Sequence, residues 1–285
     1  MSDRILRAMT DDGALRVMTL RSTDTVKGAL GAQAAPASVR GALSELLSAA
    51  ILYRETMAPT LRVQCFIKGN NETGTLIADS SPEGWSRVLA QLPKGEDALD
   101  LGPGALLQMT RALPGGKLHQ GVVELPSGDI NEGVMRYMQL SEQIVTMVRV
   151  ATVFDDAGEV VSAGGYLVQL LPEAPDRVGP VRLMAQRLED DFKDLGPRLL
   201  KTDADPQDLM NELLWGMKHT PLGDSPLRPG CECSRPRIMA TLSTMSRDDI
   251  RGLIADGIPL DMNCDWCNTE YRVELAVLRG LASPS

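Results

Sequence analysis

Four of the five cysteines in the 285-residue sequence lie in two tight pairs near its C-terminal end. The first pair is Cys231 and Cys233, the second is Cys264 and Cys267, and residues 234–263 separate them. Either pair alone could arise by chance. Two pairs flanking a spacer of subdomain size are instead typical of a tetrahedral zinc site with four thiolate ligands. We therefore predict that these four cysteines bind one Zn²⁺ ion.

The alternative interpretation of these cysteines is a set of free thiols in a hydrophobic core. Core cysteines behave as small hydrophobic residues and sit among apolar neighbours. The neighbours of these pairs include Glu232, Asn263 and Asp265, which are polar or charged. The surroundings therefore favour a metal site.

Thiolate ligands make such a site sensitive to oxidants. Oxidation through sulfenic acid to disulfides removes the ligands and releases the metal. After metal loss, the nearest partner of each sulfur along the chain is the other cysteine of its pair, which predicts the disulfides Cys231–Cys233 and Cys264–Cys267. A bridge between residues so close in sequence is strained and easily reduced. The spacing thus favours a reversible switch over a permanent structural site.

Residues 227–285, which contain the four cysteines, are too few to build a large hydrophobic core. Residues 246–249 resemble a capping box and predict a short helix over residues 250–254, and alternating residues 271–275 predict a strand. A structural zinc site contributes on the order of 10–16 kcal/mol of apparent binding free energy. We expect zinc to supply much of the stability of this small C-terminal domain.

Residues 176–226 are predicted to form a helical linker, following a change of composition at residues 172–175. Apolar residues at helical spacing predict amphipathic helices within residues 178–200 and after Pro206. Gly-Pro pairs interrupt this pattern, and short isolated helices are marginal in water. The linker should therefore dock on a partner surface, and only weakly.

Residues 1–175 are predicted to form a mixed α/β core domain in which a β-sheet packs against helices, which makes the whole chain an α+β protein. Helical spacing of apolar residues between Pro36 and Met57 predicts a buried helix. Asp129 is expected to cap a second helix over residues 129–143.

Several β-strands are predicted in the same core domain. Turn residues 155–158 should join two long β-rich runs, 145–154 and 159–171, into a hairpin. Gly164 and Gly165, adjacent inside the second run, predict a bulge or the close approach of another backbone. Further strands are predicted at residues 14–20, 61–68, 75–78, 105–110 and 120–125.

Composition limits the possible partners and location. The formal charge of −9, from 38 acidic and 29 basic residues, argues against a nucleic-acid-binding protein, which needs a surplus of Lys and Arg. Arg235 and Arg237 follow the first cysteine pair and are interpreted as local compensation of thiolate charge. The sequence has no apolar run near the ~20 residues of a membrane span, and its start lacks a secretory signal. We expect a cytoplasmic protein with no membrane partner.

Cys65 is the unpaired cysteine, and it lies in the strand predicted at residues 61–68. No helix N-terminus or basic neighbour is evident that would lower its pKa. We interpret Cys65 as a small hydrophobic residue of the strand and assign it no role in catalysis.

The sequence resembles the heat shock protein 33 (Hsp33) family of redox-regulated chaperones. The resemblance rests on the cysteine motifs, in residues 231–235 and 264–271, and on three further motifs in the same order along the chain. These motifs are residues 3–17, residues 137–143 and residues 164–172. Together they extend the likeness over nearly the whole sequence.

The resemblance implies a chaperone that holds unfolding proteins without ATP, and no enzymatic activity. It implies that the reduced, zinc-bound form is inactive. Oxidation would release zinc, form two disulfides between neighbouring cysteines, unfold the zinc region and then the linker, and expose apolar surface to unfolded client proteins. It also implies a homodimer in the oxidised state. Cys231, Cys233, Cys264 and Cys267 would be both the ligands and the switch.

Two other interpretations remain. A thioredoxin-like oxidoreductase using Cys264 and Cys267 would need this pair at a helix N-terminus, whereas a β-like run follows it. A constitutive protein-binding module with a purely structural zinc site would share the ligands but not the response to oxidants. The signatures G-x-S-x-G, P-loop and H-E-x-x-H are absent, so common hydrolase and kinase chemistries are not predicted.

Overall fold

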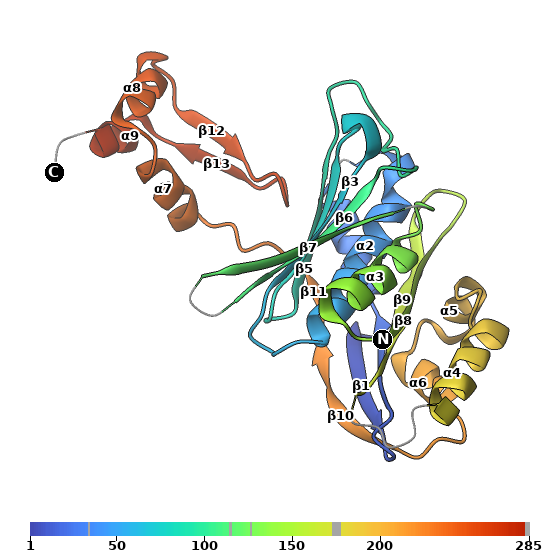
Figure 1. Cartoon of the computed structure of the whole chain (residues 1–285). Coiled ribbons are helices and arrows are strands. Elements are labelled where there is room, and N and C mark those ends of the chain that lie inside the picture. Colours follow the sequence, from blue (N-terminus) through green and yellow to red (C-terminus); the bar gives the residue numbers. More distant parts are fainter. Residues whose placement is uncertain (34, 114–115, 126, 173–177, 283–285) are drawn as a thin grey trace. The chain divides into compact units, whose positions relative to one another are not determined.

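The computed structural model describes residues 1–33, 35–113, 116–125, 127–172 and 178–282. The chain forms two compact units, Met1–Gly230 and Cys231–Ser285 (Figure 1). Both contain helices and β-sheets, so the predicted α+β class is confirmed. Among the described residues, no helix combines the length and apolar character needed to cross a membrane.

The first unit contains two antiparallel sheets, and we call them the five-stranded and the six-stranded sheet. The five-stranded sheet has the order β10-β1-β2-β9-β8. The six-stranded sheet has the order β11-β5-β4-β3-β6-β7, with only its first pair parallel. The strands of the five-stranded sheet are β1 (Arg4–Thr10), β2 (Leu15–Arg21), β8 (Thr146–Phe154), β9 (Val160–Leu170) and β10 (His219–Pro226). Those of the six-stranded sheet are β3 (Val63–Lys68), β4 (Thr75–Ser80), β5 (Trp85–Gln91), β6 (Leu106–Ala112), β7 (Leu118–Glu124) and β11 (Arg228–Pro229).

Helix α2 (Ala37–Glu55) lies between the two sheets and contacts strands of both (Figure 1). Every residue from 46 to 55 is buried, as expected of a helix that is covered on all sides. The helix predicted between Pro36 and Met57 is therefore confirmed. Two shorter helices pack nearby, α1 (Thr23–Gly31) and α3 (Ile130–Tyr137).

The five-stranded sheet contacts a hydrophobic core on each of its two faces. Successive side chains of a strand point to opposite faces, so neighbouring residues belong to different cores. On β9, Leu167 belongs to the core that contains α2. Its neighbours Tyr166 and Val168 belong to a second core on the other face. The linker helices α4 (Val178–Asp191), α5 (Gly196–Thr202) and α6 (Pro206–Leu213) cover this second face.

The predicted hairpin is confirmed as β8 and β9. A Cβ atom on Gly164 would lie 2.4 Å from the Leu20 carbonyl oxygen, and one on Gly165 would lie 2.4 Å from that of Arg149. The close backbone approach predicted for these glycines is thus confirmed, while the strand irregularity lies between Val153 and Phe154 instead.

The predicted cap of α3 is confirmed, because the Asp129 carboxylate accepts hydrogen bonds from the backbone N–H groups of Asn131 and Glu132. The α-helix ends at Tyr137, earlier than predicted, and a π-helical turn over Met138–Glu142 follows it. Gln143, with φ of 58°, ends this turn.

The expected linker differs from the structure at its end. Residues 219–226, predicted to belong to a helical segment, form the edge strand β10 and pair with β1. The expected boundary at residues 175–176 lies outside the described residues. The strands β1 and β5 were also not predicted.

The second unit is small. Its hydrophobic cluster contains three buried side chains, Leu242, Val273 and Leu278. Ser246 caps a helix as predicted, accepting a hydrogen bond from the Asp249 backbone N–H at 3.1 Å. The elements of this unit are α7 (Arg235–Ser243), α8 (Arg247–Ala255), β12 (Leu260–Asn263), β13 (Glu270–Val273) and α9 (Leu275–Ala282).

Candidate metal centre

Two short segments of the second unit carry the cysteines. Cys231 and Cys233 lie in the irregular stretch that leads into α7. Cys264 and Cys267 lie in the turn that joins β12 to β13, where Asn263 pairs with Glu270. The Asn268 N–H donates to the Cys264 carbonyl at 2.8 Å, which fixes this turn. The hairpin thereby presents both sulfurs on one turn.

The four sulfurs form one cluster. Their Sγ atoms all lie within 4.8 Å of one another. The Sγ atoms of Cys231 and Cys264 are 3.7 Å apart, and those of Cys233 and Cys267 are 3.3 Å apart. A tetrahedral zinc with ligands at about 2.3 Å separates its sulfurs by about 3.8 Å. The cluster has the ligand type, number and spacing for a metal ion of this kind.

Hydrogen-bond donors surround the sulfurs. Tyr271 Oη donates to Cys233 Sγ at 3.1 Å, and the Thr269 hydroxyl lies 3.1 Å from Cys267 Sγ. Such bonds stabilise the negative charge of thiolates and orient metal ligands. Sequence reasoning missed both residues, although both closely follow the second cysteine pair.

The pKa values of two neighbouring thiols diverge. For Cys233, burial and then hydrogen bonding within the cluster raise the pKa to about 12, against the opposing hydrogen bond from Tyr271. For Cys267, burial acts to raise the pKa, but hydrogen bonds from Thr269 and the neighbouring thiols outweigh it and lower the pKa to about 7. Four adjacent thiolates need a cation to compensate their charge.

The arginines beside the first pair bind oxygen atoms. Arg237 Nη1 donates to the Glu232 carboxylate at 3.0 Å, and Arg235 Nη1 donates to the Arg272 carbonyl at 3.0 Å. Their hydrogen bonds in the described part of the chain do not reach a sulfur.

The fifth cysteine is separate from this cluster. Cys65 lies on β3 of the first unit, is fully buried in the core around α2, and belongs to no metal-binding group among the described residues. Burial raises the pKa of its thiol. The pattern predicted a small hydrophobic residue in a strand, and this is confirmed.

A thioredoxin-like site is not supported. Cys264 and Cys267 stand in a β-hairpin turn, and strand β13 follows them. Thioredoxin-like chemistry requires a helix N-terminus at the cysteine pair, which lowers the pKa of the thiol. Among the described residues, the element that directly follows this pair is a strand and not a helix.

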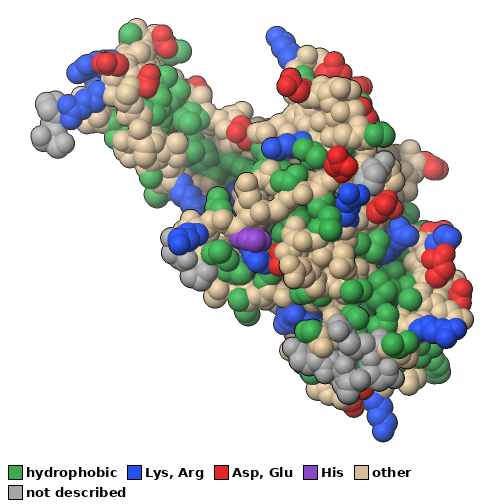
Figure 2. All heavy atoms as spheres, viewed as in Figure 1, with side chains coloured by type: hydrophobic (Ala, Val, Ile, Leu, Met, Phe, Trp, Pro, Cys, Tyr) green, Lys and Arg blue, Asp and Glu red, His purple; other side chains and the backbone are tan. Residues whose placement is uncertain are grey.

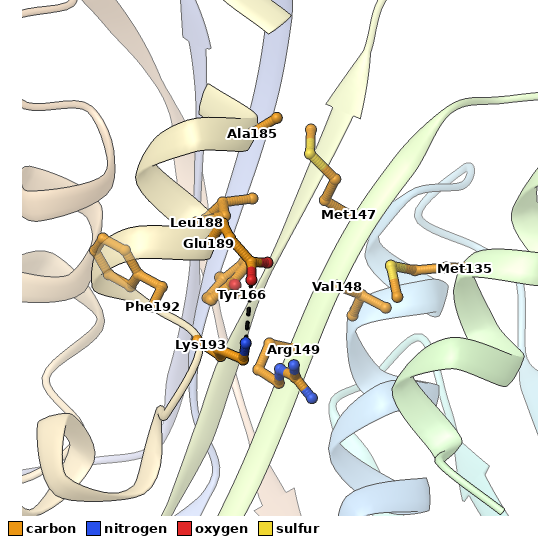
Figure 3. A pocket seen from close by; sticks show the side chains of 10 residues that line it. All are labelled: Met135, Met147, Val148, Arg149, Tyr166, Ala185, Leu188, Glu189, Phe192 and Lys193. Atoms are coloured by element: carbon orange, nitrogen blue, oxygen red, sulfur yellow. Dashed lines mark hydrogen bonds and ion pairs between the residues drawn. The ribbon is translucent and has the colours of Figure 1, made fainter. Parts of the chain in front are cut away.

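The second relevant surface is the sheet face beneath the linker helices. Leu188 and Phe192 pack against Tyr166, whose ring meets that of Phe192 edge-to-face with centroids 5.8 Å apart. Beside them a cavity of about 280 Å³ opens between α4 and β8, with Met135 and Met147 on its other side (Figure 3). Figure 2 shows hydrophobic side chains gathered where the linker helices adjoin β8 and β9.

Polar contacts also hold the linker to the sheet. Thr19 Oγ1 donates to the Pro206 carbonyl at 2.7 Å, and Arg21 Nε donates to the Asp203 carbonyl at 3.1 Å. The docking is thus more extensive than the interrupted helical pattern predicted. Its buried linker side chains are Met184, Leu188, Phe192, Leu195, Leu199, Ala204, Leu209, Met210, Leu213 and Leu214.

Comparison with known proteins identifies the family of this chain. The sequence pattern of the family described as Hsp33 protein matches residues 3–274. The chain belongs to the Hsp33 family. The resemblance seen in the motifs is therefore confirmed, and it spans both compact units.

Relatives within the Hsp33 family match over nearly their full length. The 33 kDa chaperonin of Desulforamulus reducens is 27% identical over 96% of this chain and 95% of its own. That of Agathobacter rectalis is 28% identical over 98% of this chain and 99% of its own. These names denote chaperones, so family membership supports a chaperone function.

A solved structure shares the fold. The crystal structure of the 33 kDa chaperonin (heat shock protein 33 homolog) from Thermotoga maritima matches with a TM-score of 0.80 and 23% identity. The match covers 99% of this chain and 98% of that one. It extends the Hsp33 assignment to the arrangement of the backbone.

Proposed function

We propose that this protein is a redox-regulated, ATP-independent holdase that binds unfolding proteins after oxidation of its cysteines and release of zinc. The observation that carries the proposal is the cluster of four sulfurs within 4.8 Å in a unit whose hydrophobic cluster contains three buried side chains. Membership of the Hsp33 family supports the chaperone part. The redox part rests on the chemistry of the sulfurs.

Cys231, Cys233, Cys264 and Cys267 would hold one Zn²⁺ ion in the reduced protein. When bound, zinc compensates the charge of four thiolates and ties the stretch before α7 to the β12–β13 turn. Tyr271 and Thr269 would orient two of the sulfurs through their hydroxyl groups. This is the zinc-bound, inactive state.

A peroxide would act as the oxidant. One thiolate attacks the O–O bond to give a sulfenic acid and, with a proton from solvent, water or alcohol; the second thiolate then displaces the sulfenic oxygen, which takes up a proton and leaves as water. We propose the disulfides Cys231–Cys233 and Cys264–Cys267. In the folded unit close sulfur contacts also join the two pairs, at 3.7 Å between Cys231 and Cys264 and 3.3 Å between Cys233 and Cys267. The proposed bridges would therefore form as the unit loses its metal-bound arrangement.

The linker helices are the second element of the switch. They run from α4 to α6, and the chain continues through β10 and β11 directly into Cys231. If the linker helices leave the sheet, apolar side chains on the sheet and on the linker itself become accessible. Those on the sheet include Tyr166 and Val168 of β9 and Leu15 and Val17 of β2. A large contiguous apolar surface that is exposed to solvent is typical of an interaction site. Met135 and Met147 at its edge have adaptable side chains suited to varied clients.

The proposed setting follows from the same chemistry. A reducing cytoplasm would keep the sulfurs as thiolates until oxidative stress. The clients would be unfolded proteins with exposed apolar segments, and the oxidised form would be a homodimer. We propose that neither nucleic acids nor membranes are partners of this protein.

The test compares zinc-loaded reduced protein with peroxide-treated protein at equal concentration. Suppression of the aggregation of a chemically denatured client is measured by light scattering. We expect protection only from the treated form, with zinc release followed in parallel by a chromogenic chelator. Equal protection by both forms, or protection by the reduced form alone, would refute the redox switch.

The extensive docking of the linker favours one second candidate, a constitutive protein-binding module with a purely structural zinc site. Such a module would keep Phe192 packed on Tyr166 in both redox states. Zinc that stays bound under peroxide while client binding persists would establish this alternative.

A further inference from the structure

A cavity of about 350 Å³ opens in the first unit where the end of α2 meets the five-stranded sheet. Its walls come from four elements that are distant in sequence. Arg7 lies on β1, Arg16 on β2, and Leu222 and Ser225 on β10, while Arg54 and Glu55 end α2. The proposed switch does not use this cavity.

Positive charge dominates the cavity. Three arginines line it, against the single carboxylate of Glu55. Glu55 is already shared, because it accepts from Arg7 Nη1 and from the Ser225 hydroxyl. The nearby carboxylate of Glu83 attracts Arg54 but does not line the cavity. The formal excess is thus two positive charges, carried by guanidinium groups, since the Ser225 O–H already donates to Glu55.

One of these donors lacks an acceptor. The Arg54 side chain is 5% exposed and is paired, because its Nη2 lies 2.5 Å from Glu55 Oε1 and its Nε donates to the Ser80 hydroxyl at 3.0 Å. Arg16 donates from Nη2 to the Glu55 carbonyl at 2.9 Å, while its Nε has no acceptor in the described chain. A buried donor without an acceptor costs free energy. A ligand with acceptor oxygens would satisfy it.

The pKa directions agree with this excess of charge. Burial lowers the pKa of the Arg16 guanidinium, and repulsion from Arg7 lowers it further, against attraction to Glu55. Burial likewise lowers the pKa of Arg54, with Glu55 and Glu83 opposing and Arg7 adding to it. The cations are therefore crowded beyond what the nearby carboxylates compensate.

We propose that this cavity binds a small oxyanion of the phosphate class carrying at least two negative charges, such as inorganic phosphate, pyrophosphate or a phosphate ester. The planar guanidinium groups match such oxygens in pairs. The volume is at the lower end of the range for small-molecule sites, about 300–1,000 Å³. A dianion would balance the two excess charges.

Binding would also hold β10 in place, because the ligand would fill the space between Leu222 and Ser225 of this edge strand and the end of α2. A ligand that binds only the folded form stabilises it in proportion to its occupancy. The amides of β10 should therefore exchange hydrogen more slowly when the cavity is filled.

The test uses reduced, zinc-loaded full-length protein at low chloride concentration, titrated calorimetrically with pyrophosphate, orthophosphate and glycerol phosphate. One anion is expected to bind per chain. Tighter binding of pyrophosphate than of glycerol phosphate would assign the site to inorganic anions, and the reverse order to phosphate esters. The proposal would be overturned if none of the three probes bound one-to-one at concentrations up to about 10 mM, which is well above the dissociation constants typical of ligands.

A matched pair of variants tests the location. Leu222 lines the cavity and is 46% exposed, so substitution there should leave the fold intact. Leu222→Glu adds a carboxylate that competes with the anion and should weaken binding about tenfold or more. Leu222→Gln adds an uncharged side chain of nearly the same shape as glutamate, and should change the affinity less than about threefold. Equal affinities of the two variants would show that the anion binds elsewhere.

A second pair tests the arginines. Arg16→Gln should weaken binding at least about tenfold through loss of a charge-assisted donor. Arg136→Gln, at an exposed position on α3, should have no effect. Slower hydrogen exchange of β10 with pyrophosphate, seen in the parent and in Leu222→Gln but not in Leu222→Glu, would confirm that the ligand holds β10 in place. If Arg16→Gln does not fold, the Leu222 pair decides.

Discussion

The two compact units differ sharply in how they are held together. In Met1–Gly230, α2 is buried between two sheets, and residues 46–55 are all buried. In Cys231–Ser285, the hydrophobic cluster has three buried side chains, and four sulfurs gather at the turn of a two-stranded hairpin. One unit is stabilised by apolar burial. We propose that the other depends on metal–sulfur bonds, which an oxidant can break.

The magnitudes support this contrast. A fully buried Val or Leu side chain contributes about 1.5–3 kcal/mol. A structural zinc site contributes on the order of 10–16 kcal/mol. For the small unit, the proposed zinc site would outweigh the three buried side chains of the hydrophobic cluster combined, whereas the larger unit has no comparable metal-binding group among its described residues.

The largest expected effect comes from removing ligands. Replacing Cys231 and Cys264 together by Ser should abolish zinc binding and unfold the second unit, while α2 keeps its hydrogen-exchange protection. Zinc content by mass spectrometry and exchange of β12 and β13 amides measure this. Cys65→Ala is the control, since Cys65 lies in the other unit and should leave zinc bound. Retained order in β12 and β13 of the double variant would contradict the contrast.

A smaller effect is expected at the linker. Leu188 and Leu183 both lie on α4. The side chain of Leu188 is 8% exposed, whereas that of Leu183 is 49% exposed. Leu188→Ala should weaken docking by about 2–5 kcal/mol and raise both dye binding and client protection by the reduced protein. Leu183→Ala should behave like the parent. Identical behaviour of the two variants would show that apolar docking does not restrain the surface.

A cap substitution probes the second unit alone. Ser246→Ala removes the acceptor for the Asp249 N–H at the start of α8, and should cost about 1 kcal/mol. Because that unit has little other stability, a chelator should extract zinc faster from the variant. Ser243→Ala is the control, since this hydroxyl donates only to the Ala240 carbonyl within α7. Faster zinc loss from both variants alike would exclude the cap as the cause.

The smallest effect is a pH dependence confined to the first unit. Burial acts to raise the pKa of Glu142, but hydrogen bonds from Tyr53, Arg111 and Tyr137 outweigh it and lower the pKa below its ordinary value of 4.5. The folded state therefore favours the carboxylate. Its stabilisation is complete above pH 4.5 and is lost as the pH falls through the folded-state pKa.

Urea unfolding of the first unit should thus have a midpoint that declines on acidification below pH 4.5. Glu142→Gln should flatten this decline. Zinc content should be measured in parallel, because thiolate ligands also become protonated in acid. An unchanged acid dependence in Glu142→Gln would assign it to other carboxylates.

The sequence predicted those features that depend on local pattern. The α2 helix follows from apolar spacing after Pro36, the β8–β9 hairpin from its turn residues, and the sulfur cluster from the cysteine spacing. β10 was missed because Pro221 and Gly223 interrupt any strand pattern. As an edge strand paired on one side with β1, it tolerates such residues.

Long-range details of the site could not be read from the sequence. The bond from Tyr271 to Cys233 joins residues 38 positions apart and depends on how β13 turns toward the first cysteine pair. The extent of linker docking was also underestimated. The helical pattern gives the apolar stripe but not the complementary face of β2 and β9 that receives it.

We propose that the sulfur centre keeps the second unit folded and, through it, keeps the apolar sheet face covered. Hydrogen exchange with mass spectrometry on full-length protein, before and after peroxide treatment, tests it most directly. We expect zinc to be released and protection to be lost in β12, β13 and α4 to α6, while α2 remains protected. Zinc release without loss of protection in the linker helices would contradict it.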